Sequence, residues 1–257
     1  MKKIFIIPDR LEMEETLALT KSYSLGFEYN DFISPDVLDD EGEVQRICEM
    51  YKMHPLPEFC TIHGTFFDVI PCSPDARIRE ISNMRIEQSL KAAIKIGASA
   101  VIFHTNYNPF LNSKDYIEKW TNQNATFWSS ILEKYSNINI YLENMFDLTP
   151  NILEKLSEQL CNYDNYGVCL DFAHAVLSTT HPKIWAEHLG KYIKHIHIND
   201  NDLISDLHLA WGKGKIDRQM FYDCYEKYMQ GASVLIETSS MKNRIESLEK
   251  LKEEGFL

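Results

Sequence analysis

Short apolar runs alternate with amphipathic stretches along the whole 257-residue chain. The apolar runs are rich in Ile, Val, Phe and Tyr, which is typical of buried β-strands, and the stretches between them carry apolar residues at helical spacing. The predicted strands are Lys3 to Ile7, Gly26 to Tyr29, Phe59 to His63, Ala100 to His104, Ile138 to Glu143, Gly167 to Asp171, His195 to Ile198 and Ser233 to Glu237. The predicted helices are Glu12 to Tyr23, Glu43 to Met53, Asp75 to Ile96, Tyr116 to Tyr135, Thr149 to Leu160, Pro182 to Tyr192, Asp217 to Tyr228 and Ile245 to Glu253.

Eight strand–helix repeats without a linker predict an α/β fold, a (β/α)8 TIM barrel, formed by a single domain over residues 1–257. A doubly wound open sheet is the competing architecture. It would carry a glycine-rich turn after the first strand, and Pro8-Asp9-Arg10-Leu11 is unlike one. The long irregular stretches follow the third, fourth and seventh strands, so they are expected to wall a pocket at the carboxyl ends of the strands.

Seven of the apolar runs end on a potential metal ligand or acid/base group. These residues are Glu28, His63, His104, Glu143, Asp171, His197 and Glu237. In a barrel, the carboxyl ends of the strands meet on one face, so such side chains converge there. Glu143 and Asp171 point into the barrel if Leu142 and Leu170 before them face the helices. Taken singly, each is more consistent with a hydrogen-bonded structural residue at the rim, so the prediction of a site depends on all of them occurring together.

Several carboxylates buried close together require positive charge between them. Interleaved imidazoles and a divalent cation supply it, and a shell of His and carboxylate groups suits zinc, manganese or another first-row ion. Two local spacings support such a site. Asp171 is followed three residues later by His174, and Asp206 is followed two residues later by His208.

The composition is that of a globular protein, with 44% hydrophobic and 25% charged residues. The net charge of -12 disfavours nucleic acid as a partner, although a local basic groove could exist within an acidic average. Six scattered cysteines without a C-x-x-C pair indicate reduced thiols. The chain shows neither a cleavable leader nor an apolar stretch long enough for a membrane span, which predicts a cytoplasmic protein without a membrane partner.

The strand-end motifs follow one another in a fixed order. They are Ile62-His63-Gly64, Phe103-His104, Leu142-Glu143-Asn144, Cys169-Leu170-Asp171-Phe172-Ala173-His174, Ile196-His197-Ile198-Asn199-Asp200, Asp206-Leu207-His208 with Gly212 and Gly214 behind, and Ile236-Glu237-Thr238. This order resembles the xylose isomerase-like TIM barrel superfamily over nearly the whole chain. That superfamily includes sugar and sugar-phosphate isomerases and epimerases, and the endonuclease IV type of abasic-site nuclease.

The resemblance implies two versions of the site. In the isomerase or epimerase version, one metal ion is held by Glu143, Asp171, His197 and Glu237, and the two glutamates are the catalytic acid/base pair for proton transfer through an enediolate on a small sugar substrate. In the nuclease version, three zinc ions share these four residues and five more, which are His63, His104, His174, Asp206 and His208. The implied cofactor is therefore one to three divalent ions, zinc or manganese.

Four residues are candidates for binding the substrate. The resemblance implies that His174 holds a substrate oxygen, Phe66 and Trp211 lie on loops that could form a sugar-stacking wall, and Lys213 could reach a phosphate or hydroxyl group. His195 shares a face with His197 one layer deeper, which predicts a supporting role. The resemblance does not use Glu28 as a ligand, so Glu28 is expected in a salt bridge at the rim. A homo-oligomer is left open.

Overall fold

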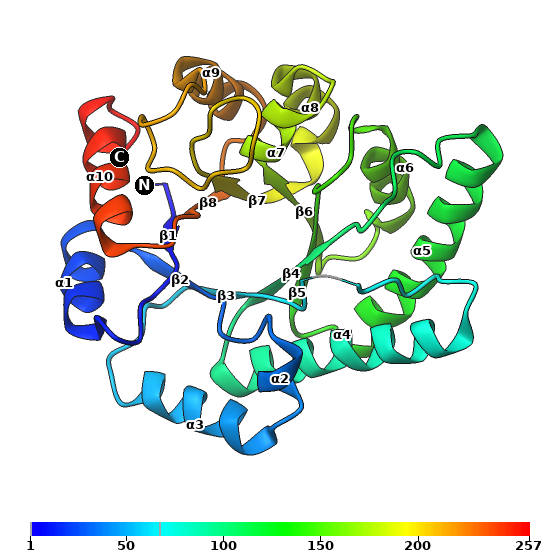
Figure 1. The fold of residues 1–257 in the computed structure, drawn as a ribbon, viewed down its shortest axis with the longest axis horizontal. Helices are drawn as coiled ribbons and strands as arrows, with labels where there is room; N and C mark the ends of the chain where they lie inside the picture. Colours follow the sequence, from blue (N-terminus) through cyan, green and yellow to red (C-terminus); the bar gives the residue numbers. More distant parts are fainter. Residues whose placement is uncertain (1, 67) are drawn as a thin grey trace.

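Eight parallel strands close into a barrel in their chain order, from β1 next to β2 around to β8 next to β1. The computed structural model describes residues 2–66 and 68–257. Figure 1 looks onto the barrel, with the helices arranged around its outside. The strands are β1 (Ile4–Ile6), β2 (Gly26–Tyr29), β3 (Cys60–His63), β4 (Ala100–His104), β5 (Asn139–Glu143), β6 (Tyr166–Asp171), β7 (Ile193–Ile198) and β8 (Ser233–Ile236). The predicted (β/α)8 fold is confirmed.

The helices that cover the barrel agree closely with the predicted ranges. They are α1 (Met13–Tyr23), α2 (Pro35–Leu38), α3 (Glu41–Lys52), α4 (Ala76–Ile96), α5 (Lys114–Lys134), α6 (Asn151–Leu160), α7 (Phe172–Leu177), α8 (Pro182–Leu189) with the short 3₁₀ helix η1 (Gly190–Tyr192), α9 (Arg218–Tyr228) and α10 (Met241–Glu253). Within the described part of the chain, none of them has both the length and the apolar character of a membrane-crossing helix.

Two short helices and one helix start differ from the prediction. The sequence pattern did not predict α2 or α7, because four to six residues are too few to show a helical period. Helix α7 begins directly after β6, where the Asp171 carboxylate accepts a hydrogen bond from the His174 amide (2.6 Å). Helix α10 begins four residues before its predicted start, since the Ser240 side chain caps it by accepting from the Asn243 amide.

Alternation along the strands sends apolar side chains outward and polar ones into the barrel. In β7, Ile196 and Ile198 belong to the apolar core, whereas His195 and His197 are fully buried polar residues. The same pattern places Leu142 before Glu143 and Leu170 before Asp171 in adjacent strands. Register then sets the neighbours, because His104 pairs with Glu143 and Asp171 pairs with His197. The barrel interior is therefore polar at the carboxyl end of its strands.

Candidate metal centre

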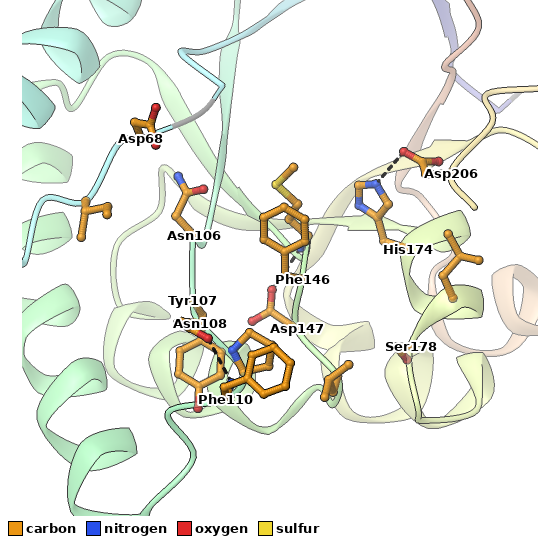
Figure 2. A pocket seen from close by; sticks show the side chains of 15 residues that line it. Asp68, Asn106, Tyr107, Asn108, Phe110, Phe146, Asp147, His174, Ser178 and Asp206 are labelled. Atoms are coloured by element: carbon orange, nitrogen blue, oxygen red, sulfur yellow. Dashed lines mark hydrogen bonds and ion pairs between the residues drawn. The ribbon is translucent and has the colours of Figure 1, made fainter. Parts of the chain in front are cut away.

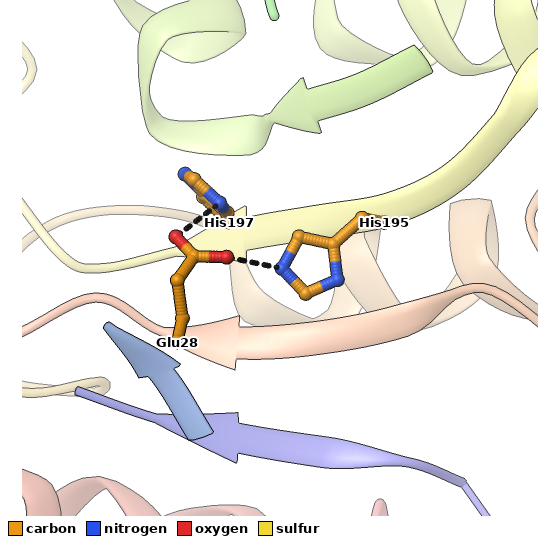
Figure 3. Close-up of side chains that lie close together, drawn as sticks. All are labelled: Glu28, His195 and His197. Atoms are coloured by element: carbon orange, nitrogen blue, oxygen red, sulfur yellow. Dashed lines mark ion pairs between the residues drawn. The ribbon is translucent and has the colours of Figure 1, made fainter. Parts of the chain in front are cut away.

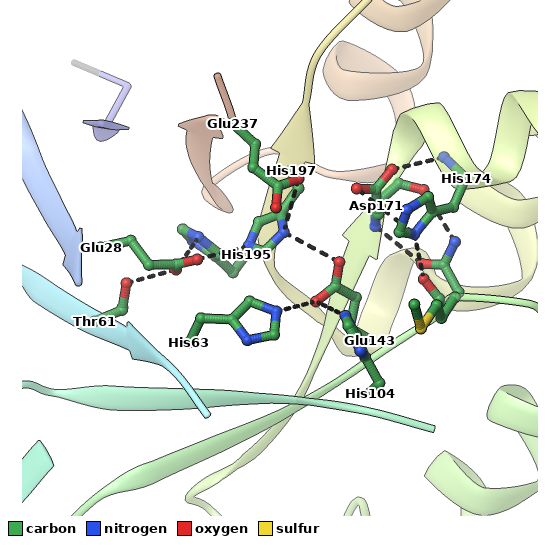
Figure 4. Close-up of polar contacts among 12 residues, drawn as sticks. Glu28, Thr61, His63, His104, Glu143, Asp171, His174, His195, His197 and Glu237 are labelled. Carbon is green, nitrogen blue, oxygen red and sulfur yellow. Dashed lines mark hydrogen bonds and ion pairs between the residues drawn. The ribbon is translucent and has the colours of Figure 1, made fainter. Parts of the chain in front are cut away.

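Four ligand candidates from four strands gather at the carboxyl end of the barrel (Figure 4). His197 Nδ1 lies 3.1 Å from Glu143 Oε1 and 3.6 Å from Glu237 Oε2. Ligand atoms of Asp171, His197 and Glu237 all lie within 4.8 Å of one another. Glu143 and Asp171 end β5 and β6, while Glu237 directly follows β8 and is held there by a hydrogen bond from its amide to the Ile198 carbonyl. These residues could coordinate a single ion.

His63 and His104 form a second cluster with Glu143. Their Nε2 atoms lie 3.4 Å and 3.5 Å from Glu143 Oε2. His63 Nδ1 lies 3.0 Å from the Gly64 carbonyl oxygen, which can only accept, so Nδ1 carries the proton and the Nε2 lone pair faces the carboxylate. The Phe66 ring packs against both imidazoles, with centroids 4.7 Å from His104 and 5.6 Å from His63. Phe66 thus covers this cluster.

The third predicted group, His174, Asp206 and His208, lies at the outer edge of the site. Asp206 Oδ2 lies 3.3 Å from His174 Nε2 and 2.9 Å from His208 Nε2. The Nδ1 atoms of the two imidazoles lie 2.9 Å from the Asn144 carbonyl and 3.0 Å from the Glu237 carbonyl, so both rings turn Nε2 toward Asp206. All nine predicted ligand residues therefore lie in one connected network.

The long loop between β7 and α9, which carries Asp206 and His208, is anchored on the buried side chain of Asp200. Its carboxylate accepts hydrogen bonds from the amides of Gly212 (2.9 Å) and Ile216 (3.0 Å). Gly214 packs so tightly here that a Cβ would lie 2.3 Å from Asp200 Oδ1. Gly212 has φ of +90°, a backbone conformation that favours glycine. The Gly-x-Gly segment is a fixed turn that positions the two ligand candidates.

Glu28 lies inside the barrel, and the expected salt bridge at the rim is wrong (Figure 3). Its side chain is fully buried, and it contacts His197 Nε2 and His195 Nε2, each at 3.2 Å. The Thr61 hydroxyl, which is its register neighbour on β3, donates to it at 2.7 Å. Because the Glu28 carboxylate lies 3.2 Å from His197 Nε2, the Nδ1 atom of His197 faces Glu143 and Glu237. His195, the other imidazole that Glu28 contacts, lies one layer deeper than His197, as predicted.

The electrostatics of the cluster fit a bound cation. Burial raises the pKa of Asp171 to about 7, with Glu237 and Glu143 adding to the shift and His174 opposing it. Burial also opposes ionisation of Glu143, yet His197 and His104 hold its pKa well below the ordinary value. Three carboxylates this close cannot all be ionised without added positive charge. A divalent ion would supply that charge.

Buried polar atoms without a hydrogen-bond partner also indicate a cation at this site. Among the described residues, several buried polar atoms of the site have no hydrogen-bond partner: Glu143 Oε2, Asp171 Oδ2, Glu237 Oε2, His63 Nε2 and His197 Nδ1. Two of these are imidazole lone pairs that face carboxylate oxygens, so a proton or a cation must lie between them. A donor set of imidazole nitrogen and carboxylate oxygen suits zinc or manganese. The residues present therefore fit a divalent metal.

Cys169 lies beside this centre, which was not predicted. Its sulfur lies within 4.8 Å of ligand atoms of Glu143 and His197. The signal was available in the sequence, since Cys169 precedes Asp171 by two residues and shares its face of β6. Burial raises the pKa of the Cys169 thiol well above its ordinary value. Without a bound cation the thiol is therefore protonated.

Two of the four residues predicted to bind the substrate, Trp211 and Lys213, make their contacts with other parts of the chain. Trp211 is only 1% exposed, and its indole donates to the Tyr222 hydroxyl at 3.0 Å, so it has no face free for a sugar. Lys213 forms an ion pair with Glu246 on α10 (3.4 Å), away from the ligand cluster. Both follow from the fixed turn around Asp200, which directs the loop after Ala210 toward the outer helices. His174 and Phe66 do lie at the site.

A cavity of about 780 Å³ opens beside the centre (Figure 2). It shares His174 and Asp206 with the outer edge of the ligand network and extends over the loops that follow β3, β4 and β5. Apolar side chains form much of its wall, including Phe110, Phe146 and Leu148. This volume lies within the range of small-molecule sites.

Asp147, in the wall of this cavity, gives a test by pH. Burial raises its pKa to about 6, against hydrogen bonds from the Thr105 hydroxyl (2.7 Å) and the Met145 amide (3.0 Å). The folded protein thus binds a proton more tightly than the unfolded chain, so this group lowers the free energy of unfolding as pH rises from about 4 to about 6. We expect the free energy of unfolding of Asp147→Asn to decline by about 2–3 kcal/mol less than that of the wild type between pH 4 and pH 7. Urea unfolding at the two pH values measures this difference. Asp164→Asn, at an exposed site, should leave it unchanged; an identical decline in Asp147→Asn would contradict the assignment.

Comparison with known proteins assigns the chain to a family. Residues 19–254 match the model of the xylose isomerase-like TIM barrel family, so the chain belongs to that family. It is 29% identical over 206 residues to an uncharacterized protein of Methanocaldococcus jannaschii, covering 75% of this chain and 68% of the relative.

Two solved structures illustrate the shared fold. A D-tagatose 3-epimerase-like protein superposes with a TM-score of 0.75 at 22% identity, over 98% of this chain and 96% of that one. A Thermus thermophilus protein soaked with zinc chloride has a TM-score of 0.77 at 20% identity, over 100% of this chain and 98% of that one.

Proposed function

We propose that the protein is a divalent-metal-dependent isomerase or epimerase that acts on a small sugar. The observation that carries the proposal is the pair of buried glutamates, Glu143 and Glu237, which approach His197 Nδ1 from different strands at 3.1 Å and 3.6 Å. Membership of the xylose isomerase-like family supports it, as does the likeness to an epimerase-like protein.

The two glutamates suit proton transfer between neighbouring carbons. Each reaches the same small volume from its own side of the barrel, so one can remove a proton from a carbon next to a carbonyl group while the other returns it. Asp171 and His197 complete the set that would hold an ion between them. A divalent ion bound here would polarise the substrate carbonyl and so acidify the neighbouring carbon–hydrogen bond. His174, at the edge of the cavity, is placed to bind a substrate oxygen.

A zinc-dependent phosphodiesterase is the second candidate. The observation in its favour is the His63–His104 cluster on Glu143, which offers a further ion site beside the first. Cleavage of a phosphodiester also calls for cations that hold phosphate groups. Among the described residues that line the adjoining cavity, none is Lys or Arg. The isomerase or epimerase therefore has the stronger support.

Metal content separates the two candidates. For protein purified without chelator, we expect elemental analysis to find about one first-row divalent ion per chain, held by Glu143, Asp171, His197 and Glu237. About three zinc ions per chain would instead favour the phosphodiesterase.

Isotope exchange tests the chemistry itself. We expect the metal-loaded protein to exchange a carbon-bound hydrogen of at least one ketose for deuterium in heavy water, because Glu143 or Glu237 must carry that proton in turn. Mass spectrometry of the recovered sugars measures the exchange. A broad panel of ketoses without exchange, combined with cleavage of an abasic-site oligonucleotide, would overturn the proposal.

A further inference from the structure

We propose that the cavity beside the metal centre is a subsite for an apolar, uncharged substituent of the substrate, so that the preferred substrate is an unphosphorylated sugar derivative with an aromatic or alkyl group. This inference rests on the proposed function and names the substrate class of the same site. The cavity is continuous with that site through His174 and Asp206.

The walls of the cavity are apolar and aromatic. Phe110 and Phe146 are 89% and 55% exposed, although side chains of this kind are ordinarily buried. In Figure 2 both rings lie among the side chains that surround the cavity, on the loops after β4 and β5. Leu148 and Ile70 add exposed aliphatic surface. Apolar surface that converges on a concave site favours an apolar ligand group.

The charges of the wall disfavour a phosphate. Within the described residues, the lining includes the carboxylates of Asp68, Asp147 and Asp206 but no Lys or Arg. A phosphate group would meet these carboxylates and one imidazole, His174, which is already paired with Asp206 at 3.3 Å, and it would find no guanidinium or ammonium to bind it. The cations Arg79 and Lys119 line a neighbouring cavity, which contains none of the nine ligand residues. A phosphorylated sugar seated at the metal centre would therefore place its phosphate in an acidic, apolar environment.

The size of the cavity agrees with a substituent larger than the sugar alone. Its volume of about 780 Å³ is toward the upper part of the range for small-molecule pockets. The ligand cluster lies at one edge, where Figure 2 shows His174 and Asp206, and Phe146 and then Phe110 follow at increasing distance from them. A sugar at the metal centre can then project a group from one of its carbons toward Phe146 and Phe110.

The test compares matched ligands that differ in one group. Phenyl and methyl ethers of several ketoses, substituted at a hydroxyl away from the carbonyl so that the carbonyl stays free, are titrated into the metal-loaded protein by calorimetry, together with each free sugar and its phosphate. We expect at least one phenyl ether to bind roughly tenfold more tightly than its methyl counterpart, since one more ring is buried. Every sugar phosphate is expected to bind more weakly than the free sugar.

Variants tie the preference to this cavity. The double variant Phe110→Ala, Phe146→Ala should lose the phenyl preference while metal content stays unchanged. Phe59→Ala is the matched control, because Phe59 is also partly exposed but precedes β3, at the opposite end of the barrel from the ligands. A phenyl preference that survives the double variant would overturn the proposal.

The remaining outcomes are also decisive. Equal binding of phenyl and methyl ethers across the panel, or tighter binding of a phosphate, would overturn the subsite. A wild-type dimer that the double variant converts to a monomer would assign this surface to a subunit interface and equally overturn it. Hydrogen exchange without a phenyl preference would leave the proposed isomerase standing and remove the subsite. A phenyl preference without hydrogen exchange would leave the subsite standing and remove the proposed isomerase.

Discussion

Replacing Glu143 by glutamine is expected to abolish both metal retention and hydrogen exchange. Glu143 is the residue that the two imidazole clusters share, with one oxygen facing His197 and the other facing His63 and His104. An amide provides only one oxygen and no charge, so the variant loses a ligand and leaves three imidazoles facing a neutral group. We expect hydrogen exchange to fall by at least about 10³-fold, as loss of an acid/base group and of metal binding combine.

The measurement pairs elemental analysis with isotope exchange in heavy water. Circular dichroism verifies that the barrel is still folded. We expect it to be, because loss of the Glu143 carboxylate also relieves its repulsion with Asp171. Glu187→Gln is the matched control, since Glu187 is exposed on α8, outside the barrel. A Glu143→Gln protein that keeps its metal and its exchange would show that the cluster is a structural polar core.

Replacing Glu28 is expected to weaken metal binding from a position outside the nine predicted ligand residues. The buried carboxylate orients His197 through a 3.2 Å contact with Nε2, and it also pairs with His195. In Glu28→Gln the amide can accept from only one of the two imidazoles, so the orientation and basicity of His197 change. Loss of such a partner typically lowers metal affinity 10- to 100-fold, which we expect here. Competition with a chromophoric chelator measures this affinity without reference to activity.

Glu28→Ala is expected to affect the fold as well. Removal of one partner from a buried ion pair leaves the other without compensation, so we expect the free energy of unfolding to fall by about 3–5 kcal/mol. Thr61→Val provides a graded control, since it removes only the hydrogen bond from Thr61 to Glu28 and should cost about 1 kcal/mol. Wild-type metal affinity in Glu28→Gln would show that Glu28 merely fills the barrel interior.

The barrel and most of its ligand set could be predicted because both depend on local patterns. Strand alternation is a property of consecutive residues, so Leu142 before Glu143 and Leu170 before Asp171 indicate which side chains point inward. The closing of the sheet then brings all strand ends to one face. Local spacing singled out His174, Asp206 and His208, the resemblance implied their role as ligands, and the structure places them at the edge of that face.

The sequence could not predict the roles of residues that depend on contacts across the barrel. Alternation after Phe27 is compatible with an inward Glu28, but its contact with His197 on β7 is set by the tilt and stagger of the closed sheet. Trp211 lies on a loop of the catalytic face, yet the turn around Asp200 turns its ring into the outer core. Loop paths of this kind depend on long-range hydrogen bonds that no local pattern encodes.

The sequence by itself determined the eightfold repeat, the inward parity of the strand-end acids and imidazoles, and an acidic overall charge. The tertiary structure alone decided how these residues are grouped, which His nitrogen faces which carboxylate, and that an apolar cavity without Lys or Arg among its described lining residues adjoins the site. The physical reason is that the alternation of apolar and polar residues depends only on residues close together in the chain. Coordination and cavity shape arise between side chains that only the closed barrel brings within a few ångströms of one another.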